Sequence, residues 1–294
     1  MIEIADPAAM RSWARRERAA GRRVGLVPTM GSLHEGHLRL VDRARRLSDR
    51  VVVSAFVNPL QFGPGEDYDR YPRDPARDRA FAESRGVDCL FMPGREAMYP
   101  EVPAVRFAAG DLVAHLCGPR RPGHFEGVLL VVAKLLHVVE PDVAVFGRKD
   151  AQQAILISRM VADLTFPVTI EIAPIVREAD GLALSSRNMY LGPAELRAAV
   201  ALSAGLESAH QAFGNGERSP AALLRRVREV VNGHPAVALE YVEAVDPRTL
   251  QPVATAGPDT LLAVAAQVGP ARLIDNIVLG EGLAADERLP GVAP

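Results

Sequence analysis

Residues 24–37 read VGLVPTMGSLHEGH, a short apolar run followed by a glycine-bearing turn and two histidines. The apolar run at residues 24–27 is typical of a buried parallel strand, and the residues after the turn predict a helix from about His34 to Ser48. A turn between a strand and a helix presents backbone N–H groups and the positive end of the helix dipole. The segment therefore predicts a phosphate site in an α/β fold.

Three other interpretations compete with a phosphate site. A P-loop requires Lys and then Ser or Thr after the second glycine, where this chain has His37 and Leu38. A zinc-protease helix requires histidines four residues apart, whereas His34 and His37 are three apart. The third alternative, that both histidines only cap or pack the start of a helix, stays open on this segment alone.

The composition of the chain bounds its class. Its length of 294 residues predicts one large and one smaller domain. Its 48% hydrophobic and 24% charged residues are typical of a globular enzyme. The formal net charge of −2 gives no basic field for nucleic acid, and the distant Cys89 and Cys117 indicate neither a disulfide framework nor a metal cluster. The unpaired cysteines fit a reducing cytoplasm. The N-terminus lacks the apolar core of a signal peptide and no stretch is long enough to span a bilayer, so we expect a soluble protein without membrane partners.

Strands and helices alternate along the first half of the chain. Further strands are expected at residues 51–57, 87–92, 143–146 and 168–172, and helices at residues 75–85, 127–139 and 150–164. The alternation predicts about five parallel strands in a Rossmann-like sheet. A G-x-G-x-x-G fingerprint is missing after the first strand, so such a sheet does not imply NAD.

The character of the chain changes past Arg177. Helices are expected at residues 193–213 and 219–232, and closely spaced strands at 239–245, 261–268 and 272–279 indicate an antiparallel sheet. We therefore expect a Rossmann-like domain at residues 1–177 and a smaller α+β domain at residues 178–294 that covers the active-site cleft. The tail from Ala284 to Pro294 is expected to fray.

A second segment repeats the strand, turn and helix pattern. Residues 146–153 read FGRKDAQQ, in which Gly147 permits close approach to the backbone and Lys149 can neutralise phosphate charge. Gln153 lies one helical turn beyond Lys149 and carries an amide suited to a hydroxyl or carboxylate. Only two of the 34 basic residues are lysines, Lys134 and Lys149, which draws attention to Lys149 in this segment. An ordinary capped helix is the alternative here.

A third segment follows the predicted sheet. Residues 180–188 read DGLALSSRN and bring serine hydroxyls, backbone donors and the Arg187 cation into one loop, which suits a triphosphate that releases pyrophosphate. A serine-rich helix N-cap explains the same residues equally well.

The three segments, together with Asn58-Pro59-x-Gln61-Phe62, resemble in order the motifs of the pantothenate synthetase (pantoate–β-alanine ligase) family. The resemblance spans about residues 1–280 and is looser in the C-terminal third. The His-x-Gly-His pattern alone would indicate only the wider nucleotidyltransferase superfamily, and the later segments make the assignment specific. Arg148 departs from the acidic or amide side chains that are common at its position.

The resemblance implies an ATP-dependent condensation of (R)-pantoate with β-alanine, through a pantoyl adenylate, that releases AMP and pyrophosphate. It also implies Mg²⁺ as a cofactor, with ligands that the sequence does not indicate, and a homodimer as the assembly. His37 would be the proton donor, helped by His34, Lys149 and Arg187. Gln61 and Gln153 would hold pantoate, and Gln61 would also lie near β-alanine. The ATP site would comprise Met30, Gly31, Ser32, Leu33, His34, Glu35, Gly36, His37, Gly147, Arg148, Lys149, Asp150, Val176, Leu184, Ser185, Ser186 and Arg187.

Two other functions stay open at this point. Another nucleotidyltransferase, such as a phosphopantetheine or nicotinamide mononucleotide adenylyltransferase, would share the first segment, although such enzymes tend to be shorter and to lack the second domain. A nucleotide-binding regulatory protein would use the same phosphate site without turnover.

Overall fold

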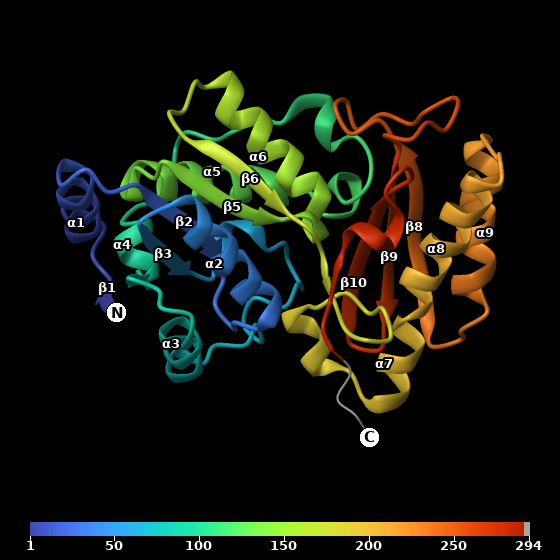
Figure 1. Cartoon of the computed structure of the whole chain (residues 1–294), viewed down its shortest axis with the longest axis horizontal. Coiled ribbons are helices and arrows are strands. Elements are labelled where there is room, and N and C mark those ends of the chain that lie inside the picture. The colour runs from blue at the N-terminus through green and yellow to red at the C-terminus, as the bar shows by residue number, and fades with distance from the viewer. Residues whose placement is uncertain (291–294) are drawn as a thin grey trace. The chain divides into compact units, whose positions relative to one another are not determined.

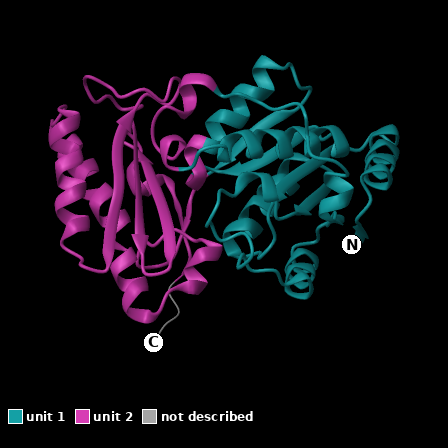
Figure 2. Cartoon of the chain, turned by 180° about the vertical axis from the view of Figure 1, so that it is seen from behind, with its two compact units in different colours: residues 1–109, 121–148, 153–173 teal, residues 110–120, 149–152, 174–294 magenta. Residues whose placement is uncertain are grey.

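The computed structural model describes residues 1–290 of the chain and divides into two compact units (Figure 2). Unit 1 comprises residues 1–109, 121–148 and 153–173. Unit 2 comprises residues 110–120, 149–152 and the chain from residue 174 onward. The main change of unit therefore falls between Ala173 and Pro174, and two short earlier segments belong to unit 2.

Unit 1 is built on a six-stranded parallel sheet with the strand order β1-β4-β3-β2-β5-β6 (Figure 1). The strands are β1 (Ile2–Ile4), β2 (Val24–Thr29), β3 (Arg50–Ala55), β4 (Cys89–Phe91), β5 (Val143–Gly147) and β6 (Thr169–Ala173). The expected α/β sheet is confirmed, but the expected count of about five strands is wrong. The sequence did not reveal β1 because three largely exposed residues show no apolar alternation, and their place depends on pairing with β4.

Helices cover both faces of this sheet, because successive strand residues point to opposite sides. On one face, Val53 and Leu90 pack in a cluster with α2 (Glu35–Leu47) and with Ala82 of α3 (Pro75–Ser84). On the other face, Cys89 Sγ lies 3.7 Å from Met10 Sδ of α1 (Pro7–Ala19), which packs beside α5 (His124–Val139). The remaining helices are α4 (Arg95–Met98) and α6 (Ala151–Asp163), whose first two residues belong to unit 2.

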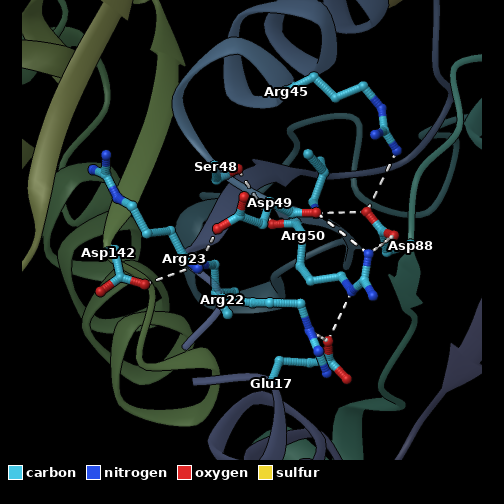
Figure 3. Close-up of polar contacts among 11 residues, drawn as sticks. Glu17, Arg22, Arg23, Arg45, Ser48, Asp49, Arg50, Asp88 and Asp142 are labelled. Atoms are coloured by element: carbon cyan, nitrogen blue, oxygen red, sulfur yellow. Dashed lines mark hydrogen bonds and ion pairs between the residues drawn. The ribbon is translucent and has the colours of Figure 1, made fainter. Parts of the chain in front are cut away.

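Aspartate carboxylates accept hydrogen bonds from backbone N–H groups at the amino ends of neighbouring strands in unit 1 (Figure 3). Asp49 accepts the backbone N–H of Arg23 at 2.8 Å, Asp142 accepts that of Val24 at 2.8 Å, and Asp88 accepts that of Val51 at 2.9 Å. Each of these aspartates lies at, or just before, the start of one strand and bonds the start of the next, so the first N–H groups of the sheet are satisfied by side chains.

Unit 2 contains an antiparallel sheet with the order β10-β9-β8, as expected. Its strands are β8 (Val237–Val245), β9 (Leu261–Val268) and β10 (Ala271–Val278), and its helices are α7 (Pro193–Ala199), α8 (Ala201–Gly214) and α9 (Pro220–Asn232). Leu206, Val227 and Val264 share one apolar core. The single helix expected at residues 193–213 is two helices, divided at Val200.

The segment after β10 is ordered up to the last described residues. The 3-10 turn η6 (Gly282–Ala285) leads into β11 (Glu287–Arg288), which pairs in parallel with β7 (Val176–Arg177). The expectation that the tail frays is therefore wrong for residues 284–290, because a backbone pairing to a distant segment holds them. Residues 291–294 lie outside the described part of the chain.

Candidate functional site

The turn after β2 is shaped by one glycine and one threonine. Gly31 has a φ of 79°, and a Cβ at this position would lie 2.8 Å from Asp78 Oδ2, so both the backbone conformation and the space require glycine. The Thr29 hydroxyl donates to the Ser54 carbonyl at 2.7 Å and accepts the Gly31 N–H at 3.0 Å. The turn is thereby tied to the end of β3.

Asp78 of α3 takes up N–H groups that the sequence predicted to be available for phosphate. Its two carboxylate oxygens accept the backbone N–H groups of Ser32 at 3.0 Å and Leu33 at 2.7 Å. Burial raises the pKa of Asp78, while these two hydrogen bonds act against the rise. In this structure a carboxylate thus accepts two N–H groups of the expected phosphate site. Asp78 could not be singled out from the sequence, because it resembles an ordinary acid in a first helical turn.

The two histidines lie at the start of α2. His34 is the N-cap, and its Nδ1 accepts the Gly36 N–H at 3.1 Å, so a neutral ring carries its proton on Nε2. The His34 and His37 rings are 4.0 Å apart at their centroids. Glu35 forms ion pairs with Arg39 and with Arg85, at 3.3 and 2.6 Å. The positive end of the helix dipole and the His34 Nε2–H donor together suit an anion.

Gln61 and Met30 meet within unit 1. Gln61 lies in the turn η1 (Pro59–Gln61) after β3, is 7% exposed, and places its Nε2 2.9 Å from Met30 Sδ. Its Oε1 accepts from Asn58 Nδ2 at 3.1 Å. Asn58 is 1% exposed and was part of the quoted motif, but the sequence assigned it no role.

The turn after β5 carries Lys149. The turn is η4 (Arg148–Asp150). Asn276 of β10 contacts it, because its Nδ2 donates to the Lys149 carbonyl at 2.9 Å. A Cβ on Gly147 would meet only Leu40 Cδ2, at 3.9 Å, so packing within the described structure does not require glycine there. Asp150 is exposed and Arg148 is half-buried, as is Gln153 on α6, which belongs to unit 1.

The remaining predicted ATP residues lie in unit 2. The Leu184 N–H donates to the Val176 carbonyl at 2.9 Å, so these two residues lie side by side. Ser185 is the N-cap of the turn η5 (Ser186–Tyr190), and its hydroxyl accepts the Arg187 N–H at 3.3 Å. The alternative of a serine N-cap is therefore correct for Ser185, and it is compatible with a ligand role for Ser186 and Arg187.

Arg177 is a buried cation that the sequence did not single out. It is 0% exposed and donates to Asp275 at 2.7 and 2.9 Å, to Asp286 at 2.7 Å and to the Gly181 carbonyl at 3.1 Å. Burial alone would lower the pKa of Arg177, but the two carboxylates raise it above its ordinary value. Arg177 thus fixes the Gly181 turn, which leads directly into residues 184–187.

The predicted site residues therefore form two sets, each described within its own unit. Unit 1 holds the residues from Met30 to His37 with Gln61, Gly147, Arg148 and Gln153, and unit 2 holds Lys149, Asp150, Val176 and the 184–187 loop. In unit 1 the polar side chains follow the carboxyl ends of β2, β3 and β5, where parallel α/β sheets commonly bind ligands.

Among the described residues, no helix combines the length and the apolar character needed to cross a bilayer.

A parallel sheet with polar motifs at its carboxyl ends, followed along the chain by a small α+β unit, defines the class of α/β proteins that bind ligands at this edge of the sheet. A sequence model of the pantoate-beta-alanine ligase family matches residues 3–278. A pantothenate synthetase of Heliobacterium modesticaldum is 52% identical over 270 residues, which cover 92% of this chain and 96% of that protein. The chain therefore belongs to the pantoate–β-alanine ligase family, whose members act in pantothenate biosynthesis.

Solved structures agree with the family. A pantothenate synthetase from Thermus thermophilus superposes with a TM-score of 0.90 at 48% identity, covering 95% of this chain and 99% of that one. A pantoate-beta-alanine ligase from Francisella tularensis, crystallised with β,γ-ATP and β-alanine, has a TM-score of 0.77 at 31% identity and covers 95% and 98% of the two chains. The expected fold class is thereby confirmed.

Proposed function

We propose that the chain joins (R)-pantoate to β-alanine through a pantoyl adenylate, with ATP as the substrate that is converted to AMP and pyrophosphate. The observation that carries this proposal is the family match over residues 3–278. The β,γ-ATP and β-alanine bound in the structure of the Francisella tularensis relative support ATP and β-alanine as the substrates.

In the first half-reaction, the pantoate carboxylate attacks the α-phosphorus and pyrophosphate leaves. The carboxylate is already a nucleophile, so the chain must chiefly position it and stabilise the charge that grows on the phosphate oxygens. His37 is the proposed proton donor, and His34, Lys149 and Arg187 are the other donors and charges. In the second half-reaction, the β-alanine amine attacks the acyl carbon of the adenylate and AMP leaves.

The proposed binding residues are those expected from the motifs. Gln61 and Gln153 hold pantoate, and the ATP site comprises residues 30–37, 147–150 and 184–187 with Val176. Because Asp78 occupies the N–H groups of Ser32 and Leu33, phosphate contacts in the first of these segments fall to the histidine side chains and the helix dipole.

Mg²⁺ fits this site as an ion carried by ATP. The described residues contain no group of three or more His, Cys, Asp or Glu side chains placed to hold a metal ion. Mg²⁺ usually keeps several waters and binds substrate phosphates with one or two carboxylates, so such a cage is not needed. When bound, the ion would neutralise phosphate charge.

The proposed reaction is tested by measuring AMP and pyrophosphate from ATP with pantoate and β-alanine added singly and together. AMP that forms only when both are present supports the ligase. Repeated turnover that releases pyrophosphate without AMP when both substrates are present would indicate nucleotidyl transfer, and the absence of both products would indicate a nucleotide sensor.

We further propose that the chain acts as a homodimer, as the family resemblance implies, and that it works in the cytoplasm, as its two unpaired cysteines suggest. Sedimentation equilibrium measures the assembly, and a monomeric mass at micromolar concentration would contradict the dimer.

A further inference from the structure

Two backbone groups in unit 1 favour one direction of the Asn58 carboxamide. The Leu60 N–H donates to Asn58 Oδ1 at 3.3 Å, and Asn58 Nδ2 donates to the Gly127 carbonyl at 3.0 Å. An N–H can only donate and a carbonyl can only accept, so a flipped Asn58 would oppose like groups at both positions. A Cβ on Gly127 would lie 2.2 Å from the Leu60 carbonyl oxygen, so glycine permits this close approach of α5 to η1.

The direction of Asn58 in turn sets that of Gln61. Because Asn58 presents Nδ2 to Gln61, the atom of Gln61 that faces it must be the acceptor Oε1. Gln61 Nε2 then points the other way, where the contact described for it is Met30 Sδ, a weak acceptor, at 2.9 Å. The amide thus offers N–H donors on the Met30 side.

Tyr99 and Lys134 complete this chain of contacts. The Tyr99 hydroxyl donates to Asn58 Oδ1 at 3.0 Å, and Lys134 Nζ lies 5.3 Å from the centre of the Tyr99 ring. Burial raises the pKa of Tyr99, so its hydroxyl keeps its proton. A cation over the ring draws electron density from the phenol and strengthens the hydroxyl as a donor. Lys134 is the other of the two lysines in the chain, and the catalytic proposal gives it no role.

We propose that Tyr99, with Lys134 over its ring, is a positioning residue that acts through Asn58 to hold the Gln61 carboxamide with its NH₂ group toward pantoate. The proposal deepens the proposed function and depends on it, because pantoate is the ligand assigned to Gln61. An amide held in the other direction would present an acceptor oxygen to the pantoate carboxylate, and like charges would repel.

The test compares Tyr99→Phe with the wild type in steady-state pantothenate synthesis. Removal of the hydroxyl leaves Asn58 Oδ1 with the longer Leu60 contact, and we expect the KM for pantoate to rise about tenfold. We expect kcat and the KM for ATP to change less than about threefold. Tyr241→Phe is the matched control, because it also removes a buried tyrosine hydroxyl. This hydroxyl lies in unit 2 and contacts Cys117 Sγ, so its removal should leave the KM for pantoate unchanged.

A double-mutant cycle separates positioning of Gln61 from a general loss of structure. In a Gln61→Ala background, Tyr99→Phe should have no further effect on the KM for pantoate, because the amide that it positions is gone. Lys134→Met should raise the KM for pantoate about threefold. Lys134→Arg keeps a cation over the ring and should leave this KM close to the wild-type value. The lysine variants also serve as the test if Tyr99→Phe does not fold.

Three results would overturn the proposal. One is an unchanged KM for pantoate in folded Tyr99→Phe, and another is an equal effect of this substitution with and without Gln61. The third is a wild-type chain that makes no pantothenate, which removes the proposed function as well and is seen before any variant is compared.

Discussion

The two ends of the parallel sheet in unit 1 use polar side chains differently. At the amino ends of the strands, Asp49, Asp88 and Asp142 accept backbone N–H groups among partly exposed arginines (Figure 3). At the carboxyl ends, Asp78 also accepts backbone N–H groups, but neutral amides such as Asn58 and Gln61 are buried there and bonded in one direction. A carboxylate accepts through either oxygen, whereas an amide or a neutral imidazole has a donor end and an acceptor end. The hydrogen bonds at the amino ends can therefore tolerate small changes in geometry. The amides at the carboxyl ends can present a donor in a defined direction.

The largest expected effect is on activity and comes from the carboxyl end. His37→Ala should lower pantoate-dependent pyrophosphate release at least about a hundredfold, because a lost preorganised donor typically costs about 3 kcal/mol of transition-state stabilisation. The free energy of unfolding in urea should stay close to that of the wild type. His234→Ala, at an exposed position in unit 2, is the control. Near-normal turnover by folded His37→Ala would remove this residue from the mechanism.

Gly127→Ala should disturb both activity and stability. The new Cβ would lie 2.2 Å from the Leu60 carbonyl oxygen and 2.7 Å from the Gln61 N atom, so η1 must move. We expect a loss of about 2 kcal/mol in unfolding free energy, and a fall in kcat/KM for pantoate of more than about tenfold as Gln61 is displaced.

Gly214→Ala provides the matched control for this substitution. Gly214 is the last residue of α8 and has open space where a Cβ would be added, so alanine should be neutral or slightly stabilising. Equal behaviour of the two variants would contradict the close contact between α5 and η1.

A substitution at the amino end should affect stability alone. Asp88→Ala removes the acceptor for the Val51 N–H and the partner of Arg45 and Arg50. Because water can reach this partly exposed site, we expect a loss of about 1 kcal/mol in urea unfolding and unchanged kinetic constants. A large change in the KM for ATP or pantoate would mean that the two ends of the sheet are not independent.

Two ion pairs should respond differently to acid and salt. Burial raises the pKa of Glu66, but hydrogen bonds from Arg121 lower it below its ordinary value of 4.5. A depressed folded pKa means that this pair stabilises the fold above about pH 4.5 and that the contribution is lost as the pH falls through the folded pKa. Urea unfolding from pH 7 to 3 should therefore show a flatter acid limb for Glu66→Gln than for the wild type.

Glu17, at the amino end of the sheet, provides the comparison. Its pKa is lowered by Arg22 first and by Arg50, whose side chains are 37% and 36% exposed, whereas Arg121 beside Glu66 is 14% exposed. In 1 M salt, where the screening length is about 3 Å, the effect of Glu17→Gln should vanish and that of Glu66→Gln should persist. The Glu17 side chain is itself 14% exposed and that of Glu66 is 25% exposed, so the comparison tests the exposure of the arginines, and equal salt sensitivity would contradict it.

Much of the fold could be predicted from local sequence patterns. The elements that the sequence did not reveal share one cause. The β-branched runs of β2, β3 and β5 are long enough to be recognised as buried strands. β1, β7 and β11 have two or three residues each, and the segments that they pair with are far away in the sequence. Arg177 shows the same limit, because its partners Asp275 and Asp286 lie about 100 residues further along the chain.

The sequence by itself determined the chemical inventory of this protein: paired histidines at a helix start, two lysines among 34 basic residues, and motifs in the order of one ligase family. Only the tertiary structure decided that Asp78 takes two N–H groups of the first turn, and that Gln61 turns its NH₂ group toward Met30. The physical reason is that a hydrogen bond has a direction. That direction depends on partners such as Tyr99 and Gly127, which the chain brings to Asn58 only on folding.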